Sequence, residues 1–127
     1  MILRDLAFSD FDQISSRYYT YYDEIRENPY FGISVRQPKP TMANQSTSFA
    51  EFFKMTLEGD AVVSVAEEEG KIIGTAEIYR HSNNSEHSHK GELGMWVEKQ
   101  HRGKGVGTAL LEDVLRKAKG KFEMVDL

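Results

Sequence analysis

The segment over 91–127 constrains the fold of this chain most strongly, because a strand, a glycine-rich loop, a helix and another strand follow one another in it. GELGMWV at 91–97 and KFEMVDL at 121–127 have the composition of strands. Between them, the apolar spacing over 105–119 is that of an amphipathic helix. A strand–helix–strand crossover makes its two strands parallel in one sheet. Together with an antiparallel hairpin expected before it, the segment predicts an α/β fold with a mixed sheet.

The residues before this crossover complete a single domain, as expected for 127 residues. Serines followed three residues later by acidic residues mark helix starts, and two β-branched runs around a glycine turn mark a hairpin. In chain order we expect a strand over 1–7, a helix capped by Ser9 and Asp12 that ends at Asn28-Pro29, a loop over 30–45, a helix capped by Ser48 and Glu51 that ends at Gly59, strands over 61–66 and 71–80 joined by a turn over 67–70, and a polar loop over 82–89.

The predicted helix over 105–119 has an apolar face and a charged face. The side chains expected to point into the core are Val106, Leu110, Leu111, Val114, Leu115 and Ala118. Glu112 with Arg116, and Asp113 with Lys117, have the spacing of ion pairs on the outer side. Gly120 is suited to end the helix.

Composition excludes several classes of protein. A net charge of −4 with 16 Lys+Arg argues against a general binder of nucleic acid or of anionic membranes. The absence of cysteine excludes disulfides and thiolate metal sites. No apolar run reaches the ~20 residues of a membrane span, and the start of the chain is not a signal peptide. We therefore expect a cytoplasmic protein whose attraction for anions is local, at Lys99, His101, Arg102 and Lys104.

The loop QHRGKGVG at 100–107 would let backbone N–H groups approach a phosphate. A Walker A loop needs a lysine after its last glycine, but Thr108 follows Gly107 directly. A dinucleotide fingerprint needs a third glycine where this chain has Thr108 or Leu110. A P-loop nucleotidase is therefore a distant alternative, and a plain strand-to-helix turn without a ligand is another.

The remaining match is Arg102-x-x-Gly105-x-Gly107, placed after a strand that ends in Met-Trp-Val at 95–97. This arrangement resembles the acetyl-CoA loop of the GNAT acetyltransferase superfamily. The order of opening strand, first helix and hairpin also fits that family, so the resemblance covers nearly the whole chain. It implies the GNAT fold and an N-acetyltransferase that moves an acetyl group from acetyl-CoA to a primary amine in a ternary complex.

The resemblance also implies a cofactor site that uses no metal. Pantetheine would pair with the strand backbone, and the pyrophosphate would lie on the N–H groups of the loop and the first helical turn. The residues implied in acetyl-CoA binding are Met95, Trp96, Val97, Arg102, Gly103, Lys104, Gly105, Val106, Gly107 and Thr108.

For the chemistry, the resemblance implies a carboxylate that removes the amine proton and a tyrosine that protonates the leaving thiolate. Glu92 is the candidate base, Glu77 is the second choice, and a solvated strand glutamate is the alternative interpretation of Glu92. Period-two alternation predicts two strand faces, Glu92, Gly94 and Trp96 on one and Leu93, Met95 and Val97 on the other.

The tyrosine of the family would come from a helix after the strand that ends at Leu127, and none of the six tyrosines matches it. Either the chain is a fragment that lacks the C-terminal part of the fold, or a partner completes the sheet, for instance in a homodimer, or another group protonates the thiolate. An unpaired strand edge favours association. We expect that Leu127 is not the natural end of a complete enzyme. The alternative function is a non-catalytic CoA-binding or regulatory domain.

The acceptor, a small-molecule or peptide amine, is not specified by the residues. Tyrosines and acidic residues over 18–45 would suit a cationic amine. A buried aromatic helix face with a solvated acidic flank is the favoured interpretation of the same residues. His81, His87 and His89 lack the spacing of a zinc finger and are interpreted as part of a solvated loop.

Overall fold

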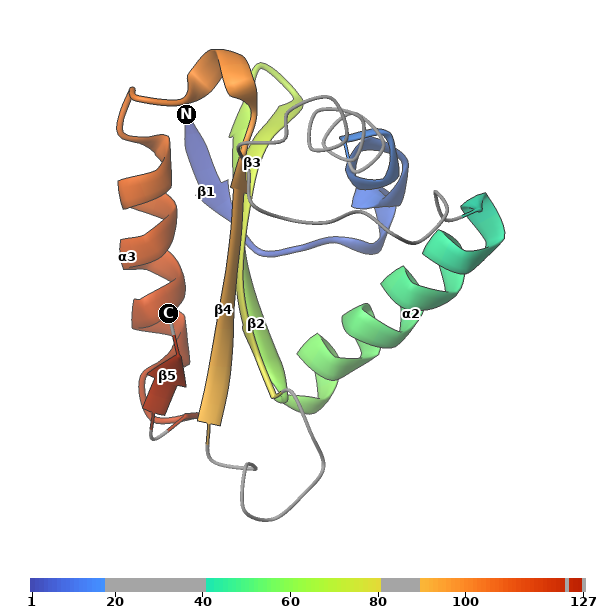
Figure 1. Ribbon diagram of the computed structural model, residues 1–127, viewed down its shortest axis with the longest axis vertical. Helices are drawn as coiled ribbons and strands as arrows, with labels where there is room; N and C mark the ends of the chain where they lie inside the picture. The colour runs from blue at the N-terminus through green and yellow to red at the C-terminus, as the bar shows by residue number, and fades with distance from the viewer. Residues whose placement is uncertain (18–40, 81–89, 123, 127) are drawn as a thin grey trace, which may run out of the picture.

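The sheet has five strands in the order β1-β2-β3-β4-β5, and all neighbours are antiparallel except β4 and β5, which are parallel (Figure 1). The structure is a computed structural model that describes residues 1–17, 41–80, 90–122 and 124–126. Its elements are β1 (Ile2–Arg4), η1 (Phe8–Asp10), a helix over 11–17, α2 (Met42–Glu58), β2 (Ala61–Glu68), β3 (Lys71–Tyr79), β4 (Lys90–Val97), η3 (Lys99–His101), α3 (Val106–Ala118) and β5 (Met124–Asp126). The mixed α/β sheet and its parallel crossover are confirmed.

Helices cover both faces of the sheet, with α3 on one side and α2 and the helix over 11–17 on the other (Figure 1). For this reason every residue of β2 from Ala61 to Ala66 is buried. The core on the α3 side consists of Val62, Ala66, Ile73, Ala76, Ile78, Val106, Leu110, Val114, Ala118 and Phe122. A smaller cluster on the other side consists of Val63, Val65 and Ile72 with Leu6, Ile14 and Phe52. Within the described residues, no helix combines the length and apolarity needed to cross a membrane.

The β2–β3 hairpin is confirmed, with a tighter turn than the expected one over 67–70. The strands continue to Glu68 and Lys71, so only Glu69 and Gly70 form the turn. Both have positive φ, 52° and 80°, which is the requirement of a two-residue turn whose twist matches the strands. A bulge between Ala66 and Glu67 shifts the register near this end.

Helix α3 buries a narrower stripe than the sequence predicts. Val106, Leu110, Val114 and Ala118 are buried as expected, but Leu115 is 38% exposed, so its inward placement was wrong. The four buried residues are four positions apart, which confines the contact with the sheet to one row. Leu111 beside this row is half-buried.

The ion pairs of α3 also differ from the expectation. Asp113 does pair with Lys117, at 3.3 Å, but both side chains are largely buried rather than on the outer side. Arg116 pairs with Asp113, three positions away, at 2.8 Å, and not with Glu112. Asp113 lies beside the sheet. Its carboxylate therefore accepts a hydrogen bond from Ser64 and pairs with Lys117.

Helix α2 begins seven residues earlier than predicted, because its cap is Thr41 and not Ser48. Thr41 caps it by accepting a 3.1 Å hydrogen bond from the Asn44 N–H, so the capping box at Ser48 and the last part of the loop over 30–45 were wrong. Polar residues in its first turns are accommodated because Ser46 donates to the Met42 carbonyl at 3.0 Å. Its end at Gly59, with φ 83°, is confirmed.

The entry into the first helix also differs from the predicted capping box at Ser9. The Asp10 carboxylate accepts a 2.8 Å hydrogen bond from the Ala7 N–H and a 2.9 Å bond from Arg4. The 3₁₀ turn η1 therefore opens the helix, and β1 is shorter than the expected strand over 1–7. On the predicted apolar face, Ile14 packs against the core; the continuation beyond residue 17 lies outside the described residues.

Candidate active site

The loop between β4 and α3 uses its glycines in two ways. Gly103 and Gly105 have φ of 77° and 85°, in the left-handed region that other residues rarely adopt. A Cβ on either would meet no atom within 4 Å, so these positions need the backbone conformation rather than space. Gly107 already lies in the helix, and a Cβ there would be 3.8 Å from Val97 and 3.9 Å from Met95. The loop therefore brings the start of α3 against the end of β4.

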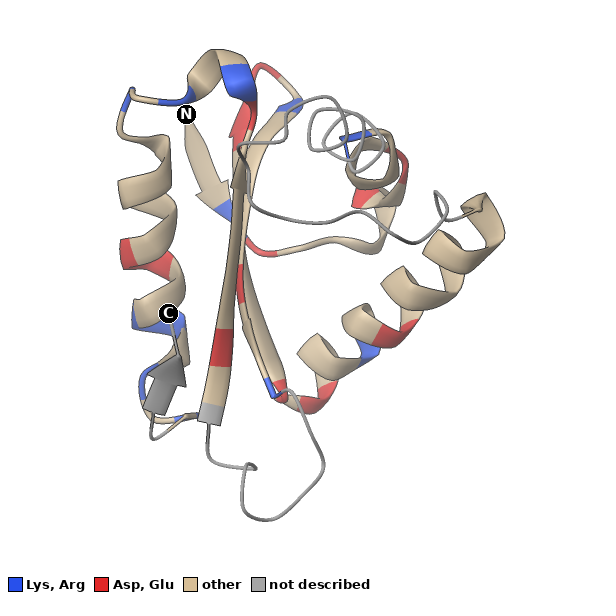
Figure 2. Ribbon diagram, viewed as in Figure 1, with Lys and Arg blue, Asp and Glu red and all other residues tan. Residues whose placement is uncertain are grey.

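The first turn of α3 presents backbone donors at this place. The Ala109 N–H bonds the Gly105 carbonyl at 3.1 Å, which closes the first helical turn. Helix geometry leaves the N–H groups of Val106, Gly107 and Thr108 without an intrahelical acceptor. Lys99, Arg102 and Lys104 nearby are exposed, and Figure 2 shows basic residues on this connection. The combination is suited to bind an anion such as a phosphate.

The loop is anchored through Glu98, which is 9% exposed. The Glu98 N–H donates to the Ile73 carbonyl at 2.8 Å, and its carboxylate lies 2.8 Å from Arg17 and 3.2 Å from Lys71. Burial acts to raise the pKa of Glu98, but the hydrogen bond from Lys71 and the charge of Arg17 outweigh it, and the pKa is lowered. A charged Glu98 therefore joins the start of the loop to β3 and to the helix over 11–17.

His101 and Arg102 extend this anchorage. The two ring nitrogens of His101 lie 3.4 Å from Glu98 and 3.3 Å from Glu68. Arg102 donates from Nε to the Val97 carbonyl at 2.9 Å, which ties the loop back to the strand. Of the four residues in the predicted basic patch, His101 thus lies between two carboxylates, while the other three are exposed.

The alternation predicted for β4 is confirmed by its register with β3. Leu93 and Val97 pack against the core beneath α3. On the opposite face Glu92, Gly94 and Trp96 stand across from Tyr79, Glu77 and Thr75 respectively. That face belongs to the side of α2, because Phe52 of α2 contacts the Tyr79 ring at 5.9 Å.

The two candidate carboxylates share this face but have different surroundings. Glu92 accepts a hydrogen bond from the Tyr79 hydroxyl, while burial raises the pKa of the Glu77 carboxyl. A Cβ on Gly94 would overlap the Glu77 carboxylate, so that carboxylate lies across β4 at Gly94. The sequence contains a signal for this arrangement, a glycine in the strand interior, but the partner of Gly94 follows only from the register.

Comparison with known proteins identifies the family. The sequence model described as the acetyltransferase (GNAT) family matches residues 22–127. The chain belongs to the GNAT acetyltransferase family. No curated protein matches the chain significantly.

Solved structures of the same fold accompany this match. A ribosomal-protein-alanine N-acetyltransferase from Brucella melitensis is 22% identical with a TM-score of 0.67, over 94% of this chain and 67% of that one. A predicted acetyltransferase with acetyl-CoA from Clostridium acetobutylicum is 23% identical with a TM-score of 0.69, over 99% and 79%. A glucosamine-6-phosphate N-acetyltransferase from Arabidopsis thaliana is 21% identical with a TM-score of 0.64, over 99% and 80%. At this identity they show the GNAT fold alone.

In this GNAT chain, β4 and β5 form a ladder over a short length. The paired residues are Lys90 with Met124, Gly91 with Val125 and Glu92 with Asp126. Met95, beyond this ladder, is 47% exposed at the start of α3, next to Gly107. The residues that the resemblance implies in cofactor binding, on the strand end, the loop and the first turn of α3, therefore lie together.

Other predicted features of the GNAT chain fall outside the described residues. These are the tyrosine-rich region over 18–40 and the loop with His81, His87 and His89. Within the part that the structure describes, no group of three or more His, Asp or Glu side chains is arranged to hold a metal ion.

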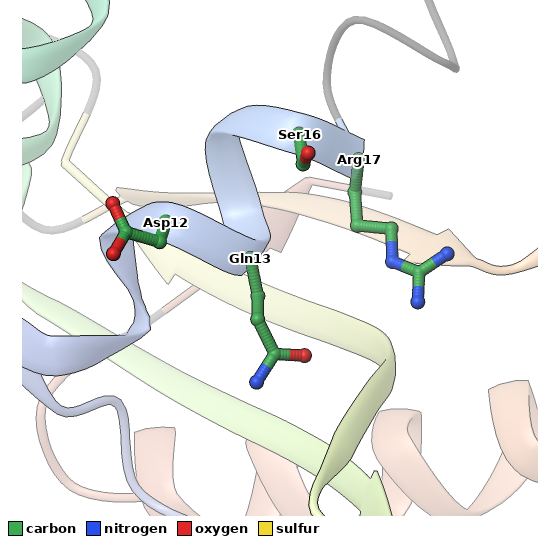
Figure 3. A pocket seen from close by; sticks show the side chains of 4 residues that line it. All are labelled: Asp12, Gln13, Ser16 and Arg17. Atoms are coloured by element: carbon green, nitrogen blue, oxygen red, sulfur yellow. The ribbon is translucent and has the colours of Figure 1, made fainter.

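A surface depression of about 310 Å³ lies on the helix over 11–17 and is lined by Asp12, Gln13, Ser16 and Arg17 (Figure 3). The Gln13 side-chain amide donates a hydrogen bond to the Gly70 carbonyl at 3.2 Å and accepts one from the Ile72 N–H at 2.9 Å. Arg17 points to Glu98. Both long side chains therefore hold the helix to the hairpin and to the loop anchor, and we assign this depression a structural role.

Proposed function

We propose that this protein transfers an acetyl group from acetyl-CoA to a primary amine, by direct attack of the amine on the thioester in a ternary complex. The observation that carries the proposal is the turn at Gly105, which sets the start of α3, whose first N–H groups have no intrahelical acceptor, beside Met95. Membership of an acetyltransferase family supports the reaction, and the Clostridium acetobutylicum relative is described with acetyl-CoA.

On the donor side, the pyrophosphate would accept hydrogen bonds from the N–H groups at 106–108, with added attraction from Arg102 and Lys104. The pantetheine amides would pair with the backbone of β4 over 95–97. The Val97 carbonyl already accepts from Arg102, and its second lone pair can accept a pantetheine N–H.

On the acceptor side, the lone pair of a neutral amine forms a C–N bond to the thioester carbonyl carbon. The C–S bond then breaks, and the sulfur leaves with the bonding pair and takes up a proton to give the CoA thiol. A carboxylate on the α2 side of the sheet takes the proton from the attacking nitrogen. Glu92, the candidate from the sequence, lies on that face, and its role stays a prediction.

The rival function is a non-catalytic CoA-binding or regulatory domain. Calorimetry with acetyl-CoA and release of free thiol with a panel of amines separate the two, on the full-length product of the gene. The panel contains amino acids, peptides with free N-termini, polyamines and amino sugar phosphates. Acetyl-CoA binding with thiol release that depends on an amine supports the enzyme; binding without turnover across the panel supports the rival.

A further inference from the structure

Glu77 and Glu92 lie at different places relative to the part of β4 that pairs with β5. Glu92 lies in the ladder with β5, where its backbone pairs with Asp126 and that edge of the strand is occupied. Gly94, across from Glu77, lies two residues further toward the start of α3, about 7 Å along the strand. It directly precedes Met95, whose side chain meets Gly107. Glu77 is thus the carboxylate nearer the proposed path of the acyl donor.

Gly94 allows Glu77 to reach this position. A Cβ at residue 94 would clash with the Glu77 Oε1 atom and stand 3.0 Å from the carboxylate carbon. The Glu77 side chain therefore extends from β3 over the backbone of β4. Any larger residue at 94 would displace the carboxylate.

The surroundings of Glu77 suit a proton acceptor. Val63 stands across from it on β2, and the cluster around Val63 includes Phe52 of α2 and Ile14. Burial raises the pKa of Glu77, and no hydrogen bond to its carboxylate is found among the described residues. A carboxylate that is poorly solvated and has no donor binds a proton more strongly than an exposed one.

The titratable groups on the described strands beside Glu77 are Tyr79 and Glu92. Burial, followed by the charges of Glu92 and Glu77, raises the pKa of Tyr79, so its hydroxyl stays protonated and donates to Glu92. Tyr79 thus engages one of the two carboxylates and leaves the other to an incoming group.

We propose that Glu77, lying across Gly94, is the base that removes the proton from the attacking amine. As the C–N bond forms, an N–H proton passes to a Glu77 oxygen, and the N–H bonding pair stays on nitrogen. The C–S bond breaks, and the thiolate takes a proton from water or from the protonated Glu77. This assignment rests on the acetyl transfer proposed above, and Glu92 has the secondary role of holding Tyr79.

The test compares Glu77→Gln with Glu92→Gln, the same chemical change on the same face, using acetyl-CoA and the best amine of the panel. We expect E77Q to lower kcat/KM by about 100-fold or more, and E92Q by less than about tenfold. Acetyl-CoA affinity by calorimetry should stay near that of the wild type in both. As pH is lowered, kcat/KM of the wild type should fall because both the amine and Glu77 become protonated. In E77Q it should fall because of the amine alone.

Gly94→Ala supplies a second, independent variant. The added methyl group displaces the Glu77 carboxylate, so G94A should lose activity in the wild type and lose little more in the E77Q background. Since E77Q removes a half-buried charge whose pKa is raised by burial, its thermal midpoint at pH 7 should equal or exceed that of the wild type, which separates lost chemistry from lost folding.

The outcomes are distinguishable. If the wild type acetylates an amine and E77Q keeps its rate while E92Q loses it, Glu92 is the base and this inference is overturned alone. If G94A and E77Q lose activity additively, the contact across β4 is not what places the base. A wild type that binds acetyl-CoA but acetylates no amine overturns both proposals.

Discussion

The Ser64 hydroxyl donates a 2.6 Å hydrogen bond to the Asp113 carboxylate and thereby joins the centre of β2 to the helix that carries the glycine loop. Ser64 is fully buried. Lys117 adds to this contact by donating to the Val63 carbonyl at 3.0 Å. Helix α3 is therefore held to the sheet by polar contacts at Asp113 and Lys117 as well as by its apolar stripe.

We expect Ser64→Ala to lower the free energy of unfolding by about 1 to 2 kcal/mol, because it removes the donor to a largely buried carboxylate. Urea unfolding measures this. Ser46→Ala is the matched control, since Ser46 is exposed and its hydroxyl, within the described part of the chain, bonds only the Met42 carbonyl of the same helix at 3.0 Å; it should cost less than about 0.5 kcal/mol. Equal losses in the two variants would contradict the role of Ser64.

The same contact predicts an acid dependence. The hydrogen bond from Ser64, opposed by burial and aided by Arg116 and Lys117, lowers the pKa of Asp113 from 3.8 to about 2. Because the folded-state pKa is depressed, the stabilisation is present above the unfolded pKa and is lost as pH falls from about 4 to about 2. The difference between wild type and S64A should therefore shrink over that range, and a constant difference would count against it.

For the loop, we expect Gly105→Asp to abolish detectable acetyl-CoA binding, because its carboxylate would occupy and repel the pyrophosphate site. Gly105→Asn is the matched control, since asparagine has the same shape without charge and tolerates the left-handed conformation seen at φ 85°. Calorimetry should show the Asp variant at least about tenfold weaker than the Asn variant. Affinity unchanged in both would refute the assignment of the loop.

Glu98→Gln should loosen the anchor of the loop. The variant keeps the size of the side chain but removes the charge that Arg17 and Lys71 approach, so stability should fall by about 1 to 3 kcal/mol. The Kd for acetyl-CoA should rise as fewer molecules hold the loop in its binding geometry. Glu68→Gln is the control, since Glu68 is 48% exposed and lies near His101 at 3.3 Å. A Kd that is the same in E98Q, E68Q and the wild type would contradict the anchor.

The stripe of α3 predicts a contrast between two leucines. Leu110→Ala should cost about 2 to 5 kcal/mol because Leu110 is fully buried, and Leu115→Ala less than about 1 kcal/mol because Leu115 is 38% exposed. Chemical denaturation at one pH compares them directly. Similar losses of unfolding free energy in the two variants would instead support the broader apolar stripe predicted from the sequence.

Local patterns were sufficient for the parts of this protein whose structure depends on neighbours in the chain. The strand over 91–97 and its alternation, and the end of α2 at Gly59, follow from residue periodicity and backbone sterics. The family match agrees with the resemblance, since its loop motif is also local. The start of α2 was misjudged because Thr41 and Ser48 are both acceptable caps, and the choice between them depends on packing.

The tertiary structure decided what depends on residues far apart in the chain. Three contacts are consequences of register and burial. Asp113 faces Ser64 instead of solvent, Glu98 pairs with Arg17 and Lys71, and Glu77 lies across Gly94. A sequence pattern contains the period of a strand or helix but not the partner it meets. The sequence by itself therefore determined the proposed donor loop, while only the folded sheet decided which carboxylate has its pKa raised by burial, because burial is a property of all the elements that pack around a side chain.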